Sequence, residues 1–192
     1  MQYHTFSKLH MHNDIDHVLF HESTIMSRLD AMARDITRDY SGEMPTVVCI
    51  LQGGIILMAD LLRRIQLPLL IETISVSSYH GGTESSGVVT FNQTTLPNLK
   101  GKPVILLDDI LDTGLTLQAI RRRFINEAGA ASVKLCVLLN KKKNRSSDIN
   151  ADYIGFDIGD EFVVGYGLDY QGQYRNLPYI GVLKESAIQR LA

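Results

Sequence analysis

The sequence predicts an α/β protein with an open, mostly parallel sheet and helices on both faces. Short apolar runs alternate along the chain with segments of helical periodicity, and this alternation is typical of strand–helix units in a parallel sheet. The 192 residues are enough for one domain with a small appended region. We expect strands at residues 46–51, 69–76, 104–107, 133–139 and 153–158, and helices at 22–40, 55–64 and 117–128.

The first predicted helix, residues 22–40, is amphipathic. Four apolar side chains recur on one of its faces: Ile25, Leu29, Met32 and Ile36. Ser41 and Gly42 end this helix, and the apolar run at 46–51 follows as a strand. A glycine turn at residues 52–54 then leads into the second helix, 55–64.

The middle of the chain continues the alternation. The strand at 69–76 has strong β character, and the polar, glycine-rich segment after it, about 77–92, predicts a flexible loop. The runs at 104–107 and 133–139 read as buried strands on either side of a helical segment. The tail after Val163 is rich in Gly, Tyr and Asp, and we expect it to lie beside the sheet.

Composition excludes several classes of protein. The formal net charge of -2 offers no general surface for polyanions, so we expect no nucleic-acid partner. No apolar run approaches the ~20 residues of a membrane span, and residues 1–16 are polar, so we expect neither a membrane partner nor a signal peptide. Cys49 and Cys136 lie inside apolar runs, which predicts buried free thiols and a cytoplasmic protein.

An acidic pair and a hydroxyl-rich loop follow the apolar run at 104–107. Asp108 and Asp109 come where we expect the strand to end, and Asp112 opens a loop of small residues, 112–116, before the next helix. Ligands of an open α/β sheet bind outside the carboxyl ends of its strands. A loop that enters a helix there offers backbone N–H groups to a phosphate.

The acidic residues indicate that the ligand contains more than a phosphate, because carboxylates do not bind phosphate directly. They bind Mg²⁺ or accept hydrogen bonds from sugar hydroxyls. A phosphate loop beside carboxylates therefore predicts a ligand such as a ribose 5-phosphate. The alternative is an ordinary strand followed by a helix cap, but a cap needs one such residue, and three Asp and two Thr exceed that.

The string from Leu106 to Thr116 resembles the phosphoribosyl-pyrophosphate (PRPP) signature of type I phosphoribosyltransferases. The resemblance implies the type I fold in a single domain, 1–192, with a small hood region formed by the N- and C-terminal segments. It implies that the loop at about 77–92 is the flexible catalytic loop. It assigns PRPP's 5′-phosphate and ribose to Asp108, Asp109, Asp112, Thr113, Gly114, Leu115 and Thr116.

A second loop, Gln52-Gly53-Gly54, resembles the family's pyrophosphate loop, in which a non-proline cis peptide often precedes the first of these residues. Alone, the glycines would also fit an ordinary tight turn. The resemblance adds Ser78, Tyr79 and Arg175 to the pyrophosphate site. Two departures from the family, Gln52 for Lys and Leu115 for a polar residue, predict altered affinity for PRPP or pyrophosphate.

The segment around residues 161–170 resembles the purine-binding segment of hypoxanthine-guanine phosphoribosyltransferases. Phe162 would stack on the base, the Val163 backbone would read its edge, and Asp169 would lie near the purine 2-position. Lys141 matches the lysine that donates to O6 of a 6-oxopurine. Without the resemblance, Phe162 and Val163 would fit core packing, and the lysine run at 141–143 would fit a solvated face.

The implied activity is purine salvage: transfer of the 5-phosphoribosyl group from PRPP to N9 of hypoxanthine or guanine, giving IMP or GMP and pyrophosphate. Asp112 is the implied general base. Mg²⁺ is the implied cofactor, with Asp108 and Asp109 as ligands and Asp169 helping to hold a second Mg²⁺. The alternatives are a xanthine-preferring transferase and a PRPP- or nucleotide-sensing regulator. Family members are commonly homodimers or homotetramers, so we expect one of these assemblies.

Four histidines crowd the N-terminal segment: His10, His12, His17 and His21. A metal site there is a possible interpretation, but no cysteine or carboxylate–histidine spacing supports it.

Overall fold

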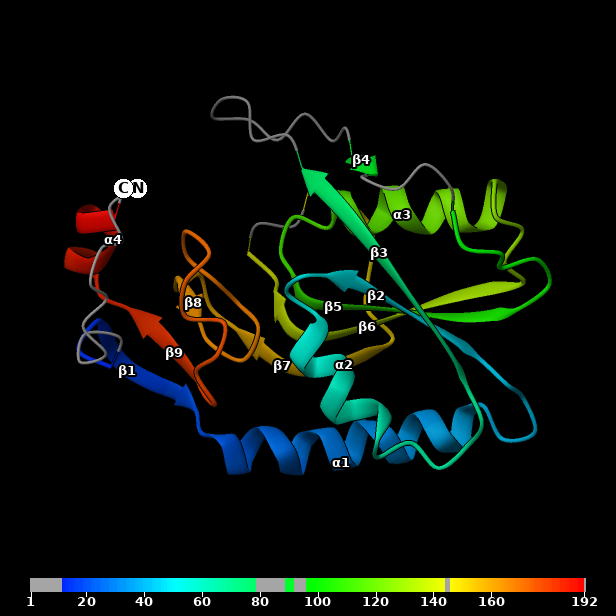
Figure 1. The fold of residues 1–192 in the computed structure, drawn as a ribbon, viewed down its shortest axis with the longest axis horizontal. Coiled ribbons are helices and arrows are strands. Elements are labelled where there is room, and N and C mark those ends of the chain that lie inside the picture. Colours follow the sequence, from blue (N-terminus) through cyan, green and yellow to red (C-terminus); the bar gives the residue numbers. More distant parts are fainter. Residues whose placement is uncertain (1–11, 79–88, 92–95, 144–145, 192) are drawn as a thin grey trace, which may run out of the picture.

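The computed structural model describes residues 12–78, 89–91, 96–143 and 146–191. Its main feature is a six-stranded sheet with helices on both faces, beside a smaller three-stranded sheet (Figure 1). The main sheet has the order β4-β3-β2-β5-β6-β7, and only β4 is antiparallel to its neighbour. Its strands are β2 (Thr46–Leu51), β3 (Leu70–Ser78), β4 (Val89–Phe91), β5 (Pro103–Leu111), β6 (Ser132–Lys141) and β7 (Tyr153–Ile158).

Helices α1 (Glu22–Asp39) and α2 (Ile55–Leu62) cover one face of the main sheet, and α3 (Leu115–Asn126) covers the other. Successive residues of a strand point to opposite faces. Val47 and Cys49 of β2 accordingly pack in the core under α1 and α2, whereas Val48 and Ile50 pack under α3. The predicted α/β class, with a mostly parallel sheet and helices on both faces, is confirmed.

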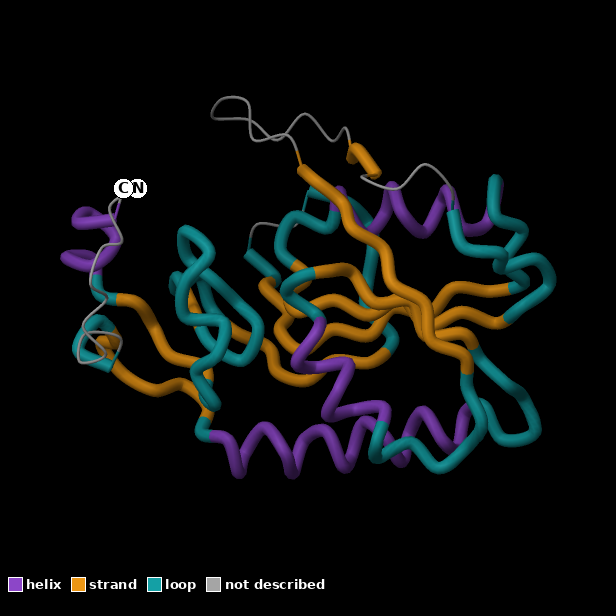
Figure 2. Tube along the Cα trace, viewed as in Figure 1, coloured by secondary structure: helices purple, strands orange, loops and turns teal. Residues whose placement is uncertain are grey.

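The smaller sheet has the order β1-β9-β8, with antiparallel pairing throughout. It joins the two ends of the described chain, since β1 is Ile15–Phe20, β8 is Val163–Val164 and β9 is Ile180–Leu183. Helix α4 (Glu185–Leu191) follows β9. The segment between β8 and β9 is almost entirely loop (Figure 2), and its only pairings are two isolated bridges.

The chain changes direction across the sheet between β2 and β5. From β2 it passes through α2 to β3 on one side, and from β5 it passes through α3 to β6 on the other side. The loops that leave β2 and β5 therefore diverge from neighbouring strand ends. Such a topological switch point is where open α/β sheets bind ligands.

Several predicted boundaries were wrong around this switch point. Helix α3 begins at Leu115 rather than at residue 117, and β3 and β4 occupy residues 77–78 and 89–91 of the loop predicted at about 77–92. The strand predicted at 104–107 continues to Leu111, so Asp108 and Asp109 lie within β5 rather than after it. The cause is tertiary: β6 keeps pairing with β5 as far as Leu111 opposite Asn140, whereas the ladder with β2 ends at Leu107. Lys141, expected after its strand, is likewise the last residue of β6.

In the part of the chain that the structure describes, none of the helices combines the length and apolar character needed to cross a membrane.

Candidate active site

The glycine turn after β2 lies directly against the acidic pair of β5. A Cβ atom on Gly53 would lie 1.9 Å from Oδ2 of Asp109, so a side chain at residue 53 would displace that carboxylate. A Cβ on Gly54 would lie 2.8 Å from Sγ of Cys49, so this residue is also closely packed. The peptide bond between Leu51 and Gln52 is cis. The structure thus brings the glycine turn and the acidic pair of β5 together at the switch point.

The acidic pair is electrostatically crowded. Oδ1 of Asp108 accepts a hydrogen bond from the backbone N–H of Asp109 at 3.0 Å. Burial raises the pKa of Asp108 well above its usual range, and the neighbouring Asp109 raises it further. Burial also raises the pKa of Asp109, although the nearby Arg175 acts in the opposite direction. Ionising both carboxylates is therefore costly unless a cation or hydrogen-bond donors accompany them.

The hydroxyl-rich loop is held by residues 146–147, which no motif in the sequence analysis pointed to. Gly114 has φ +81° immediately before α3, and a Cβ there would lie 2.3 Å from Oγ of Ser147. The Thr113 carbonyl accepts hydrogen bonds from the Ser146 N–H at 3.0 Å and from the Ser147 hydroxyl at 3.1 Å. These contacts fix the backbone from which α3 begins.

Asp112 carries an unmatched acceptor beside this loop. Its Oδ1 is buried and has no hydrogen-bond partner among the described residues. Leaving a buried carboxylate oxygen without a donor is costly, and such atoms are rare in folded proteins. A ligand that presents an N–H or O–H group at this point would satisfy it.

The loop after β8 reaches the glycine turn from the opposite side. Gly167 has φ +104°, and a Cβ there would lie 2.2 Å from the Gly53 carbonyl oxygen. The Gly167 N–H donates to the Arg175 carbonyl at 2.9 Å, and Nη1 of Arg175 donates back to the Gly167 carbonyl at 2.6 Å. Nη2 of Arg175 pairs with Oδ1 of Asp169 at 2.7 Å. Arg175 and Asp169 are therefore tied to the loop that packs on Gly53.

The predicted base-binding residues differ in exposure. Phe162 is 44% exposed and makes an edge-on contact with Tyr170, with ring centroids 5.2 Å apart. Val163 is buried in β8, and the carbonyl of Phe162 accepts from the Leu183 N–H at 3.0 Å. Lys141 is buried at the carboxyl end of β6, one residue beyond the Leu111–Asn140 pair. The exposed part of the Phe162 ring is accessible to a planar ligand.

Other predicted residues fall outside this constellation. Tyr79 and His10 lie outside the described residues, and only the backbone of Ser78 is described. His12, His17 and His21 are exposed. Within residues 12–78, 89–91, 96–143 and 146–191, no group of three or more His, Cys, Asp or Glu side chains is placed to hold a metal ion.

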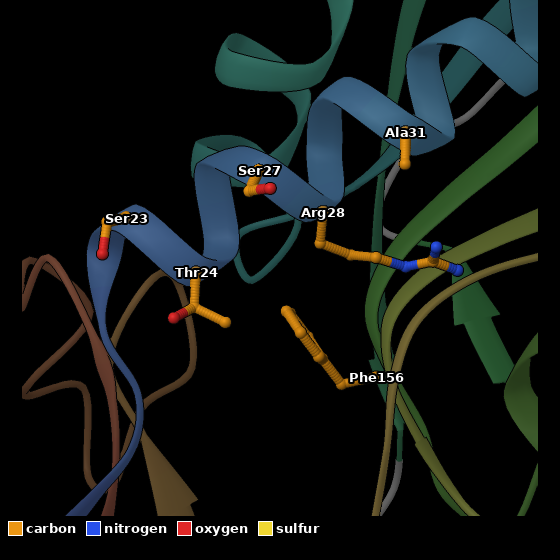
Figure 3. A pocket seen from close by; sticks show the side chains of 6 residues that line it. All are labelled: Ser23, Thr24, Ser27, Arg28, Ala31 and Phe156. Atoms are coloured by element: carbon orange, nitrogen blue, oxygen red, sulfur yellow. The ribbon is translucent and has the colours of Figure 1, made fainter.

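A pocket of about 550 Å³ opens elsewhere, between α1 and β7 (Figure 3). It shares no residue with the predicted site. Nε of Arg28 donates to the Gly155 carbonyl at 2.8 Å, so this guanidinium covers part of the outer edge of β7. Its lining consists of Ser23, Thr24, Ser27, Arg28, Ala31 and Phe156.

Comparison with known proteins identifies the family. The model of the phosphoribosyl transferase domain matches residues 19–171, which is most of the chain. The chain belongs to the phosphoribosyl transferase family. The acidic pair of β5, the glycine turn and the hydroxyl-rich loop all lie inside the matched region of this phosphoribosyl transferase domain.

Relatives within the family are similar over nearly their whole length. The hypoxanthine-guanine phosphoribosyltransferase of Streptococcus pneumoniae strain R6 is 47% identical over 175 residues, covering 91% of this chain and 97% of that protein. A hypoxanthine phosphoribosyltransferase structure from Staphylococcus aureus has a TM-score of 0.88 and 43% identity, covering 94% and 97% of the two chains. The Trypanosoma cruzi hypoxanthine phosphoribosyl transferase has a TM-score of 0.86 and 34% identity, covering 92% and 95%.

Proposed function

We propose that this protein is a purine salvage enzyme that transfers the 5-phosphoribosyl group from PRPP to N9 of hypoxanthine or guanine. The products would be IMP or GMP and pyrophosphate. The observation that carries the proposal is the contact at the switch point, where Gly53 lies against Asp109 on one side and Gly167 on the other. This contact brings the glycine turn, the acidic pair and the loop after β8 into one place.

The donor chemistry of the acidic pair fits Mg²⁺. This cation prefers oxygen ligands and is usually bound by one or two carboxylates together with substrate phosphates. Asp108 and Asp109 provide two adjoining carboxylates that burial makes difficult to ionise without a cation. They would hold one Mg²⁺, and Asp169, which pairs with Arg175 in this structure, would help to hold a second. When bound, Mg²⁺ would neutralise charge on the leaving pyrophosphate.

The chain's own groups would bind the remaining parts of PRPP. The backbone N–H groups of residues 113–116 would receive the 5′-phosphate at the start of α3, where the helix dipole favours an anion. Thr113 and Thr116 add hydroxyl donors. The backbone of Gly53 and Gly54 would receive the pyrophosphate together with Arg175, since Gln52 carries no charge.

The base would lie between the open face of Phe162 and the oxygen of Asp112 that lacks a partner. Asp112 would accept the proton at purine N7 as the new bond forms at N9. Lys141 would donate to O6, and the backbone of Val163 would read the other edge. Adenine presents an amino group where Lys141 needs an acceptor, so this unmatched hydrogen bond would disfavour adenine.

The direct test is nucleotide formation from PRPP and Mg²⁺ with hypoxanthine, guanine, xanthine and adenine in parallel. We expect IMP or GMP to form and adenine to remain unreacted. Preferential turnover of xanthine would transfer the assignment to a xanthine-preferring enzyme. Binding of PRPP without turnover of any base would instead favour a PRPP-sensing regulator, and Gln52 and Leu115 would be the first residues to restore to Lys.

We further propose a homodimer or homotetramer in the cytoplasm. In the Trypanosoma cruzi relative, the C-terminal region is associated with oligomeric state and enzymatic activity. Leu70 and Ile71 of β3 are exposed apolar residues on which a second copy could pack. Light scattering coupled to size exclusion gives the mass directly, and a monomer of 21.5 kDa would contradict the assembly.

The two buried free cysteines support the proposed cytoplasmic location, because free thiols suit a reducing compartment.

A further inference from the structure

Tyr166 occupies a backbone conformation that favours glycine. Its φ is +51°, and its neighbours Gly165 and Gly167 have φ of +98° and +104°. Among these three consecutive residues, only Tyr166 carries a side chain. A residue with a Cβ atom is disfavoured in this region of φ/ψ space, so the surrounding structure must hold it there.

The Tyr166 side chain is held from the far side of the core. It is 3% exposed and packs in the same core as α1 and α2. Its hydroxyl donates to Oδ2 of Asp60, on α2, at 2.6 Å. Nη1 of Arg64 donates to the Asp60 backbone carbonyl at 2.7 Å, and Nε of Arg64 pairs with Asp30 of α1 at 2.9 Å. The anchor therefore belongs to the layer formed by α1 and α2.

The same helix begins with the glycine turn of the site. Asp60 lies six residues after Gly54, and α2 starts at Ile55. The loop after β8 therefore meets this unit at two points: Tyr166 bonds to Asp60, and Gly167 packs on the Gly53 carbonyl. Because the loop is held at both points, the Tyr166–Asp60 hydrogen bond restricts rotation of the loop about the contact between Gly167 and Gly53.

The positions of Arg175 and Asp169 depend on that of Gly167. Arg175 exchanges two hydrogen bonds with Gly167 and pairs with Asp169. We infer that Tyr166 is a positioning residue, whose hydrogen bond to Asp60 holds Gly167 and Arg175 in the place where PRPP's pyrophosphate binds. This inference rests on the proposed function and assigns Tyr166 no contact with substrate.

Tyr166→Phe is the direct test, with Tyr153→Phe as its matched control. Tyr153 is also buried, and its hydroxyl donates to an aspartate, Asp39, at 2.9 Å, but it begins β7 at the opposite end of the sheet. Each substitution removes one hydroxyl from a Tyr–Asp pair. KM values for PRPP and hypoxanthine, kcat, and calorimetric binding of Mg²⁺–PRPP are measured for the wild type and both variants.

We expect Tyr166→Phe to raise KM and Kd for PRPP about five- to tenfold, the effect of one net hydrogen bond, with KM for hypoxanthine changed less than about twofold. Tyr153→Phe should lower the melting temperature without changing either KM. Equal KM and Kd values for PRPP in Tyr166→Phe and Tyr153→Phe would overturn the inference. A wild type that turns over no base overturns the proposed function, and the inference with it.

Variants of the acceptor separate positioning from general loosening of the fold. Asp60→Asn keeps an acceptor for the Tyr166 hydroxyl and loses mainly an exposed pairing with Arg63, so its PRPP constants should stay near wild type. Asp60→Leu removes the acceptor and should reproduce Tyr166→Phe. If Tyr166→Phe and Asp60→Leu together raise KM by the product of their separate effects, the two residues do not act through one bond, and the inference is wrong.

Discussion

At the carboxyl end of the main sheet, Asp108 and Asp109 lie side by side with pKa values above the usual range for aspartate. At the amino end, Asp39 has a pKa below that range, chiefly because the Tyr153 hydroxyl donates to its carboxylate. Nζ of Lys134 adds a contact with Asp39 at 3.4 Å. The same residue type is thus destabilised as an anion at one end and stabilised at the other.

The comparison separates two uses of polar groups. The amino-end cluster of Asp39, Lys134 and Tyr153 supplies its own donors and counter-charges, so it contributes to stability without a ligand. The carboxyl end keeps two carboxylates that resist ionisation and a buried Asp112 oxygen without a donor. Proteins commonly accept such a cost where a ligand completes the arrangement.

The largest expected effect is that of Asp112→Asn. If Asp112 receives the N7 proton, the amide should lower kcat about 10²–10⁴-fold, the usual contribution of a general base, with little change in melting temperature. Initial rates of IMP formation across pH 6–9 measure this. The matched control is Asp39→Asn at the amino end, which should lower stability and keep kcat. A kcat for Asp112→Asn within twofold of wild type would contradict the assignment.

Gly53→Ala tests the packing at the switch point. Its Cβ would occupy the place of Oδ2 of Asp109, so the carboxylate must move. We expect kcat/KM for PRPP to fall about 10- to 100-fold, the scale of an ångström-level displacement in an active site. Gly101→Ala is the control: its φ is +70°, but no atom lies within 4 Å of the added Cβ, so it adds backbone strain without a clash. Similar kinetic losses in both variants would show that general loosening of the fold, rather than the clash with Asp109, explains the result.

Asp108→Asn should separate stability from ligand binding. Without metal at neutral pH, relieving the repulsion with Asp109 should raise the melting temperature about 2–4 °C, roughly 1 kcal/mol for a chain of this length. The affinity for Mg²⁺–PRPP should fall more than about tenfold. Calorimetric melting curves and titrations with Mg²⁺–PRPP measure the two effects, and a lower melting temperature in metal-free buffer would contradict the electrostatic account.

The pH dependence of this variant has a definite sign. The folded state binds the Asp108 proton more tightly than the unfolded chain, so this group makes the metal-free protein less stable as pH rises from about 4 through its raised pKa. Asp108→Asn should flatten that decline. A wild type and variant with parallel stability curves between pH 4 and 7 would refute the assignment.

The smallest expected effect is that of Asp39→Asn, and its pH dependence is opposite. The folded-state pKa of Asp39 is lowered, so its contribution is present above about pH 4 and is lost as pH falls through the folded value. The variant should therefore melt below wild type at neutral pH, and the difference should shrink below pH 4. Differential scanning calorimetry at pH 3, 5 and 7 checks this, and a constant difference would contradict it.

Much of the site follows from local sequence. The string of residues 106–116 combines two adjoining carboxylates with a hydroxyl-rich loop and a glycine. These residues alone predict the ligand chemistry, without knowledge of residues far away in the chain. The helix at 22–40 was predicted within one residue of α1, because its four apolar side chains recur on one face. Both ends of the strand at 46–51 were predicted correctly, since an apolar run of this length between turn residues is typical of a buried strand.

Tertiary structure decided what depends on residues far apart in the chain. β5 continues to Leu111 because β6 pairs with it, and no property of residues 108–111 alone indicates that. Ser147 meets Gly114, Gly167 meets Gly53, and Tyr166 meets Asp60 across separations of 33, 114 and 106 residues. The sequence by itself determined which chemical groups the site contains, because these occur in short strings. Only folding determined which of them touch, because close packing selects one arrangement of the loops among many.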